Sequence, residues 1–386
     1  MPHGANVPRC SFKCCCIYLL NLSFQIGVLF LLASPISFAQ QYATKVELDQ
    51  PNSWSMILIP DIQNYSKYSQ NQPILDLINR WIEANIDQLN IKMVLCTGDL
   101  VEQDDVILPG LNGNLSSKQQ WEFIDKSFTI LDHKIPYILA TGNHDYTIDS
   151  KGTRTTQYDK YFPITKNYLN QKHLVQHGLN EHNLPTLTNA MYEFKGINNK
   201  DYLIVNLEYA PRNTTLNWAN EILKFKQYEN HQIVLLTHAY LNRNDTRLEG
   251  DNKWIIFEPY FKDKKERKSD RILLPESNNG EQIWNKIVKE TKNMQLVLSG
   301  HISGEGYRVD KNNFGQEVHQ MLFDMQSEGG GHQGNGGDGF IRILEFYDDN
   351  RTIKVKTFSP LFGISPKTAH LAHKRDERNQ YLIHLD

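Results

Sequence analysis

Side chains that can bind a metal ion recur at points where apolar segments of the sequence stop. Five apolar runs are each followed by Asp, Gln, Asn or His, and these candidate ligands are Asp61, Gln63, Asp99, Asn143, His238 and His301. Carboxylate, amide and imidazole donors together suit Mn²⁺, Fe or Zn²⁺. Any one of these residues is equally well explained by a turn, a helix cap or a structural contact. The inference of a metal site therefore depends on the whole set.

These five apolar runs, together with a sixth at residues 202–207, are predicted to be strands, and the five position the candidate ligands. They cover residues 54–59, 91–97, 135–140, 202–207, 232–237 and 295–299. Helical patterns lie between them, from Pro73 to about residue 89, over 118–132, around Trp218 and over about 280–290. Strand ends hold side chains rigidly, and the loops beyond them converge on one crevice. Glycines directly precede Asp99, Asn143 and His301 and permit a close backbone approach or a positive φ there.

The alternation of strands and helices predicts an α/β fold in which helices cover a sheet. Several of the strands are apolar almost throughout, as is typical of strands buried on both faces. Three later strands, at 318–325, 340–347 and 352–358, have no helices between them. They predict a second, more antiparallel sheet that packs on the first.

The order and separation of the strand-end motifs resemble those of calcineurin-like metallophosphoesterases. The motifs are Asp61-x-Gln63, Gly98-Asp99, Gly142-Asn143-His144-Asp145, Thr237-His238 and Gly300-His301. Gly-Asn-His-Asp is the most specific of them. The resemblance extends from about residue 54 to 305 and implies the family's fold, a two-sheet α/β/β/α sandwich. It also implies two divalent metal ions (Mn, Fe or Zn) as cofactors.

The resemblance implies a role for each matching residue. Asp99 would bridge the two metals, and Asp61 would bind the first metal together with Gln63. The second metal would be completed by Asn143, His238 and His301. A hydroxide held between the metals would attack phosphorus, and His144 would contact the substrate and protonate the leaving oxygen. Asp145 would orient His144.

Two departures from the family pattern both affect the first metal site. Gln63 stands where the family usually has His, and Ser303 stands at the last position of Gly-His-x-His. We therefore expect a weaker first site that favours Mn²⁺ or Mg²⁺ over Zn²⁺. Asp-x-Gln is similar to the manganese-dependent ADP-ribose pyrophosphatases of the same family. His332, in the glycine-rich segment 328–337, is a candidate substitute ligand or substrate contact, the alternative being a flexible loop.

The N-terminal segment has the pattern of a signal peptide. Arg9 and Lys13 precede an uncharged, largely apolar stretch that closes with Ser37-Phe38-Ala39, a triplet suited to signal peptidase. We expect removal of residues 1–39 and a periplasmic or secreted protein, with an uncleaved membrane anchor as the alternative. Four of the five cysteines lie in this leader, and Cys96 is expected to be buried in its strand.

The remaining chain is divided into a linker (40–53), a metallophosphoesterase domain (54–358) with a charged insertion (240–275), and a C-terminal tail (359–386). The net charge of −3 argues against a nucleic-acid-binding protein. We expect a small phosphorylated substrate, and membrane contact only if the leader is retained.

The sequence thus predicts an exported, metal-dependent hydrolase of phosphate ester or diphosphate bonds. The alternative is a binding protein that keeps the fold without turnover. The incomplete first metal site favours this alternative. The presence of His144 and Asp145 beside Asn143 opposes it, because binding alone requires no acid.

Overall fold

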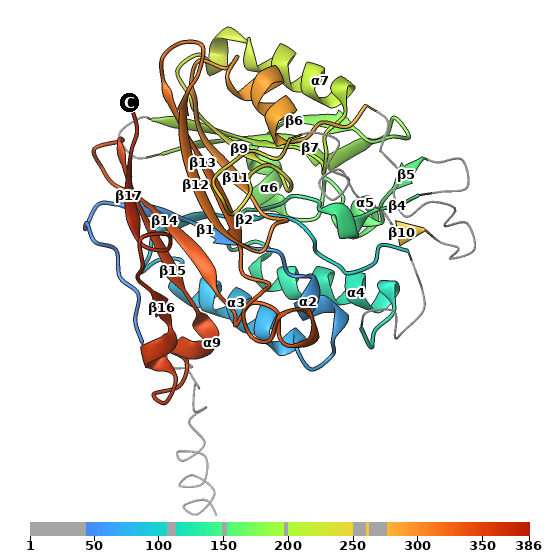
Figure 1. The fold of residues 1–386 in the computed structure, drawn as a ribbon, viewed down its shortest axis with the longest axis vertical. Helices are drawn as coiled ribbons and strands as arrows, with labels where there is room; N and C mark the ends of the chain where they lie inside the picture. The colour runs from blue at the N-terminus through green and yellow to red at the C-terminus, as the bar shows by residue number, and fades with distance from the viewer. Residues whose placement is uncertain (1–43, 106–112, 149–152, 197–199, 250–259, 262–275) are drawn as a thin grey trace, which may run out of the picture. The chain divides into compact units, whose positions relative to one another are not determined.

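The computed structural model describes residues 44–105, 113–148, 153–196, 200–249, 260–261 and 276–386 (Figure 1). The predicted leader, residues 1–39, lies outside the described residues, as does most of the predicted insertion at 240–275. Among the described residues, no helix is both long and apolar enough to cross a membrane. Cys96 is buried and unpaired, as expected from the sequence.

The first sheet has the strand order β16-β15-β14-β1-β2-β3, and β17 also pairs with β15. Its strands are β1 (Trp54–Ile59), β2 (Ile91–Cys96), β3 (Tyr137–Leu139), β14 (Ile341–Phe346), β15 (Thr352–Phe358), β16 (His373–Lys374) and β17 (Tyr381–His384). Strands β1, β2 and β3 are parallel to one another, whereas β14 pairs antiparallel with β1. All six residues of β1 are buried, as expected of an apolar strand at the centre of a sheet.

The second sheet has the strand order β12-β13-β11-β9-β8-β7-β6. Its strands are β6 (Leu174–Leu179), β7 (Pro185–Lys195), β8 (Asp201–Asn206), β9 (Gln232–Leu236), β11 (Met294–Ser299), β12 (Gly304–Lys311) and β13 (Glu317–Asp324). Neighbours among β8, β9, β11 and β13 are parallel. A small third sheet joins β4 (Thr147–Ile148), β5 (Arg154–Thr155) and β10 (Tyr260–Phe261).

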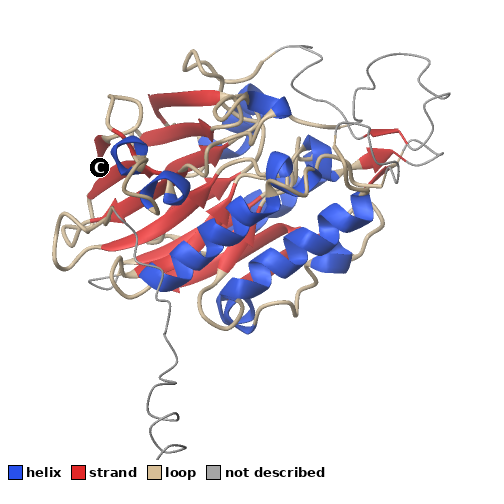
Figure 2. Ribbon diagram, turned by 90° about the horizontal axis from the view of Figure 1, so that it is seen from below, coloured by secondary structure: helices blue, strands red, loops and turns tan. Residues whose placement is uncertain are grey.

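Helices cover the outer face of each large sheet. Next to the first sheet lie α2 (Gln63–Lys67), α3 (Gln72–Asn85) and α4 (Ser117–Phe128), with α3 and α4 side by side (Figure 2). Next to the second lie α7 (Asn213–Leu223), α8 (Gly280–Ile283) and a π-helical turn at Trp284–Val288. Shorter helices are α5 (Tyr158–Tyr161), α6 (Tyr168–His173) and α9 (Pro360–Gly363). Pro73 lies in the first turn of α3, where proline is tolerated, and Ser116 and Gln119 form a capping box at the start of α4.

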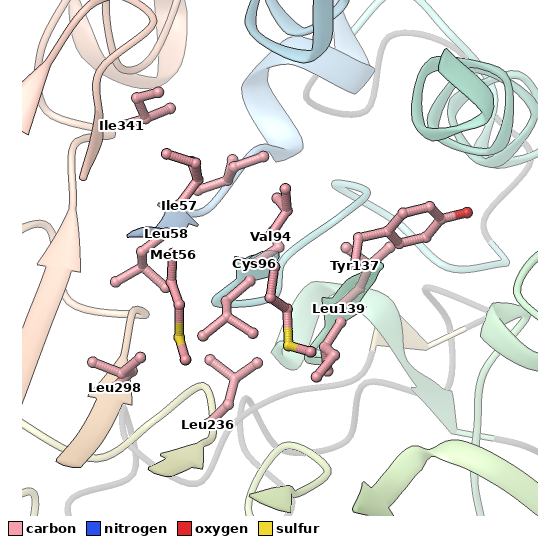
Figure 3. Close-up of a cluster of buried hydrophobic side chains, with 14 of the residues drawn as sticks. Met56, Ile57, Leu58, Val94, Cys96, Tyr137, Leu139, Leu236, Leu298 and Ile341 are labelled. Carbon is pink, nitrogen blue, oxygen red and sulfur yellow. The ribbon is translucent and has the colours of Figure 1, made fainter. Parts of the chain in front are cut away.

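The main core lies between the two sheets. Leu236 and Leu298 of the second sheet face Met56 of the first (Figure 3). At another part of this interface, the ring of Trp54 lies 5.1 Å from the ring of Tyr202 in an edge-to-face contact. The order of layers is therefore helix, sheet, sheet, helix, which confirms the two-sheet α/β/β/α sandwich implied by the sequence.

The predicted grouping of the late strands is wrong. Strand β13 joins β11 in the second sheet, but β14 and β15 cross to the first sheet, where β14 pairs with β1. The physical reason is that all six residues of β1 are buried, so the edge of β1 opposite β2 needs a partner strand, and β14 supplies it. The glycine-rich segment between β13 and β14 carries the chain from one sheet to the other.

The domain also extends beyond the boundaries expected from the sequence. Residues 359–386, expected to be a tail, form α9, β16 and β17, and both strands pair with β15. In the expected linker, Val46 is buried in the main core. Ile383 of β17 is buried and pairs with β15, so the C-terminal segment completes the edge of the first sheet.

Candidate metal centre

The candidate ligands converge because the two sheets present the carboxyl ends of their parallel strands to the same region. Asp61, Asp99 and Asn143 follow β1, β2 and β3 of the first sheet. His238 and His301 follow β9 and β11 of the second. One ligand atom from each of Asp99, His238 and His301 lies within 4.8 Å of the others. The structure thus brings together residues that are far apart in the sequence.

The second-metal half consists of Asn143, His238 and His301 together with the shared Asp99. The Oδ1 atom of Asn143 lies 3.2 Å from Nε2 of His238 and 3.0 Å from Nδ1 of His301. Nε2 of His238 is also 3.3 Å from Oδ1 of Asp99. On its other side, Nδ1 of His238 donates to the carbonyl oxygen of Thr97 at 2.9 Å, which turns Nε2 toward the centre.

Charge in this half favours a cation. Burial alone would lower the pKa of His238, but the carboxylates of Asp99 and Asp61 outweigh burial and raise that pKa. Burial would likewise raise the pKa of Asp99, yet the neighbouring His238 and His144 hold it below its usual range. Two imidazoles, an amide oxygen and a carboxylate around one point form a set that suits a divalent transition metal.

The first-metal half consists of Asp61 and Gln63 with the shared Asp99. Asp61 accepts hydrogen bonds from the hydroxyl of Thr97 (2.6 Å) and the backbone N–H of His301 (2.8 Å). Gln63 donates from Nε2 to Oδ2 of Asp99 at 3.1 Å. Its Oε1 is buried and has no hydrogen-bond partner among the described residues. An unsatisfied buried oxygen is costly, so the residues present fit a bound metal ion.

A third buried carboxylate, Asp324, lies at the end of β13 near this half. Burial raises the pKa of Asp324 well above its ordinary value, and the charges of Asp61 and Asp99 raise it further. Burial also raises the pKa of Asp61. The carboxylates therefore repel one another in the absence of a cation, which again fits a metal site.

The glycines that precede the ligands are required by close packing, as the sequence indicated. A Cβ atom at Gly142 would lie 2.0 Å from Oδ1 of Asp99, and one at Gly300 would lie 2.0 Å from Oδ1 of Asp61. Asp99 and His301 themselves have positive φ angles of 49° and 74°. Such left-handed backbone in residues other than glycine is strained and is concentrated at functional sites.

The ring of His144 contacts Glu102, whereas the sequence analysis expected Asp145 to orient it. Nδ1 of His144 lies 3.0 Å from the backbone carbonyl of Glu102, and Nε2 lies 4.0 Å from Oδ2 of Asp99. Burial would lower the pKa of His144, but Asp99 and Glu102 raise it above its usual value. The Glu102 side chain pairs with the buried Lys67 at 3.1 Å.

The carboxylate of Asp145 instead connects two loops of the site. Its Oδ1 accepts from the backbone N–H groups of Leu100 and Val101, and its Oδ2 accepts from that of Gly142. Backbone N–H groups at 2.8–3.0 Å satisfy both oxygens, so Asp145 fixes the loop after β2 against the loop after β3.

The glycine-rich segment that carries His332 is docked beside the centre on α2 and the turn after it. Asn64 and Asn71 donate to the carbonyl oxygens of Gly331 (3.0 Å) and Gly334 (2.9 Å), respectively. Burial lowers the pKa of His332, and the nearby Lys67 lowers it further. These two hydrogen bonds attach the segment to the rest of the domain, and Glu102 and His144 are among the groups whose charge acts on His332.

The sequence analysis missed three residues of the site, namely Lys67, Glu102 and Asp324. Asp324 follows an apolar strand directly, so the rule that found the other ligands also applies to it. Glu102 lies in the loop that begins with Asp99, and its backbone carbonyl contacts Nδ1 of His144. A backbone contact does not depend on the type of side chain, so the sequence could not indicate it.

Comparison with known proteins supports the resemblance. A family model described as calcineurin-like phosphoesterase matches residues 57–305. The uncharacterized protein YvnB of Bacillus subtilis is 27% identical over 334 residues, which is 83% of this chain and 21% of YvnB. The chain thus spans about a fifth of the length of that relative. GAP50, the anchor in the inner membrane complex of Plasmodium, has 11% identity and a TM-score of 0.44, with 86% of this chain and 89% of that chain covered.

Proposed function

Since the chain belongs to the calcineurin-like phosphoesterase family, we propose that it is an exported enzyme that hydrolyses phosphate ester or diphosphate bonds of a small substrate. The observation that carries the proposal is the set of contacts around Asn143, whose Oδ1 lies within 3.2 Å of ring nitrogens of both His238 and His301. Beside this set, His144 stands at the edge of the centre with its ring held by Glu102.

Two divalent ions bound by this site would supply positive charge that neutralises the phosphoryl oxygens and activates water. We assign the second ion to Asn143, His238 and His301 and the first to Asp61 and Gln63, with Asp99 shared. Mn²⁺ is the ion we propose for the first position, because its donors are oxygens.

His144 is the proposed proton donor to the leaving oxygen. A carbonyl only accepts hydrogen bonds, so the contact with Glu102 places a proton on Nδ1 of His144 and leaves Nε2 to face the centre. With Nδ1 protonated, only the imidazolium form carries a second proton on Nε2. Burial opposes that form, but Asp99 and Glu102 favour it because they raise the pKa of His144. The imidazolium can give its Nε2 proton to the oxygen that departs from phosphorus, which leaves a neutral ring with the proton on Nδ1. His332 is the proposed contact to the remainder of the substrate, since its loop is fixed beside His144 by Asn64 and Asn71.

The test is hydrolysis by purified full-length protein that has been stripped of metal and then titrated with Mn²⁺. The substrates are p-nitrophenyl phosphate, bis(p-nitrophenyl) phosphate and ADP-ribose, which represent a monoester, a diester and a diphosphate. Asp99→Ala removes the shared ligand and is expected to abolish turnover of all three. Asp159→Asn is the matched control, because that carboxylate bonds to Thr186 and Asn180 outside the centre.

Turnover that depends on Mn²⁺ and is lost only in Asp99→Ala supports the proposal, and the preferred substrate gives the bond type. Bound metal without hydrolysis of any of the three substrates contradicts it and favours a binding protein. Export is tested separately by the mass of the protein recovered outside the cytoplasm. A chain that begins at Gln40 supports cleavage after Ala39, and a chain that begins at Met1 contradicts it.

A further inference from the structure

We propose that Asp324 is a ligand of the first metal ion and replaces the histidine that the family pattern has at the position of Ser303. This inference rests on the proposed metal-dependent function. It adds a fourth donor to Asp61, Gln63 and Asp99.

The sheet places Asp324 where the missing side chain would point. Strand β13 runs parallel to β11, with Ser299 opposite Leu322, so both strands end at the same edge. Strand β12 runs antiparallel to β13, with Gly304 opposite Asp324. The short turn between β11 and β12 contains both His301 and Ser303, and Asp324 lies across from that turn.

The contact with Ser303 shows that the two positions share the same space. The hydroxyl of Ser303 donates to Oδ2 of Asp324 at 3.4 Å. An imidazole at position 303 is several ångströms longer than the serine hydroxymethyl group and would need the volume that the carboxylate occupies. Serine at 303 thus leaves room for a carboxylate from the neighbouring strand.

Among the described residues, Asp324 has no ion-pair partner, although the charge of His238 acts on it from beyond ion-pair distance. The side chain is fully buried, and the neutral donors that it has are the backbone N–H of Gln326 (2.9 Å) and the hydroxyl of Ser303 (3.4 Å). No lysine or arginine among the described residues forms an ion pair with it. A buried carboxylate without a counter-charge is costly, and a coordinated divalent ion removes that cost.

Gln63 provides an independent indication that a cation belongs at this position. The side chain is 1% exposed, and its Nε2 is held by Oδ2 of Asp99 at 3.1 Å. Oε1 is attached to the same carbon, lies near that carboxylate, and has no hydrogen-bond partner among the described residues. An amide oxygen in this situation is a ready metal ligand.

The resulting first site contains only oxygen donors, from three carboxylates and one amide. Oxygen donors suit Mn²⁺ and Mg²⁺, whereas imidazole suits Zn²⁺. Coordination by Asp324 would therefore explain why the first site prefers Mn²⁺ or Mg²⁺, whereas the second site, with its two imidazoles, suits Zn²⁺.

The test counts Mn²⁺ bound to full-length protein by electron paramagnetic resonance, which reports free aqueous Mn²⁺ and the coupling between two nearby Mn²⁺ ions. The wild-type protein is expected to bind two ions per chain and to show the coupled spectrum. Asp324→Asn keeps the size of the side chain and an acceptor for Gln326, but it is expected to weaken the first site by more than about 10- to 100-fold, the loss typical of residues that only support a ligand. Asp159→Asn serves as the matched control and should bind like the wild type.

A second variant tests the replacement directly. Ser303→His in the Asp324→Ala background restores an imidazole at the family position, in the volume that truncation of the carboxylate leaves, and it is expected to recover the second ion with Zn²⁺ now preferred over Mn²⁺. Recovery supports the proposal. A double variant that binds no more metal than Asp324→Ala contradicts the claim that the two positions are equivalent.

Metal counts separate this inference from the proposed function. Two Mn²⁺ ions per chain in both the wild type and Asp324→Asn, with equal affinity, overturn the role of Asp324 whatever the activity. Two ions in the wild type and one in Asp324→Asn, with none of the three substrates hydrolysed by either, support Asp324 and refute the hydrolase. A wild-type chain that binds no second ion overturns the inference.

Discussion

The two halves of the metal centre differ both in donors and in the structures behind them. The second-metal half has two imidazoles, and the ring of Tyr209 lies 5.9 Å from that of His238 and 6.1 Å from that of His301. Arg154 donates to the carbonyl of Tyr209 at 2.5 Å and pairs with the buried Glu208. This half is therefore supported by aromatic packing and a buried ion pair.

The first-metal half has oxygen donors and is supported by backbone contacts. Helix α2 begins at Gln63 and holds the glycine-rich segment through Asn64 and Tyr65, whose hydroxyl accepts from the N–H of Gly339 at 3.0 Å. A Cβ at Gly336 would meet the side chain of Asn64. The second-metal half thus matches the family pattern at each residue. The first-metal half occupies the same place in the fold, but Gln63 and Ser303 stand where the family pattern has histidines.

The largest loss of turnover without loss of metal is expected for a residue that lies outside both halves. His144→Ala should lower kcat by about 10²- to 10⁴-fold, the usual contribution of a general acid, because it removes the proton for the leaving group. Metal content should stay at the wild-type level, as measured by plasma emission on protein after gel filtration. If the variant lost bound metal in proportion to activity, His144 would be a metal ligand. The assignment of ligands to the two halves would then be wrong.

The next largest effect should distinguish the halves by metal type. His301→Ala should reduce Zn²⁺ affinity by at least about 10- to 100-fold with little change at the first site, because it removes an imidazole from the second. Gln63→Ala should reduce Mn²⁺ affinity instead. Competitive titration of the metal-free protein with the two ions measures both, and equal losses of both ions in each variant would contradict the comparison.

A smaller effect concerns the ion pair behind the second half. Burial would raise the pKa of Glu208, but Arg154 and Arg212 lower it from 4.5 to about 2. Because the pKa is lower in the folded state, the ionised carboxylate stabilises the protein above pH 4.5, and this stabilisation is lost as the pH falls from about 4.5 to 2. Urea unfolding of the metal-free protein should show this decline.

Glu208→Gln provides the comparison for that measurement. At pH 7 the variant should be less stable by about 1.5–3 kcal/mol, because Arg154 and Arg212 lose a charged hydrogen-bond partner, while Arg154 keeps its ion pair with Glu181. Between pH 4.5 and 2 it should lose less stability than the wild type. Identical pH profiles of the two proteins would show that Glu208 does not carry the acid dependence.

Residue type and position at a strand end were sufficient to predict which candidate residues lie close together. All five strand ends converge as expected, because an apolar strand followed by a polar ligand is a local pattern. The strands β6, β7 and β12 were not predicted. Strand β12 is only partly buried at the edge of its sheet and lacks a continuous apolar run.

What the sequence left undetermined depends on contacts between distant segments. The pairing of β14 with β1 joins nearly opposite ends of the described chain, and no local pattern specifies it. The same is true of Asp324, which becomes part of the site only because β13 lies beside β11. Glu102 acts through a backbone carbonyl, so its side-chain type carries no information about its role.

The position of β14 has a consequence for the order in which the protein is made. Strand β1 is among the first described segments to be synthesised, and its antiparallel partner β14 is synthesised long after it. Until then, one edge of a largely apolar strand lacks its partner, and such long-range pairing forms slowly. An exposed apolar edge attracts other strands. The nascent chain therefore depends on protection of β1 until β14 has been made.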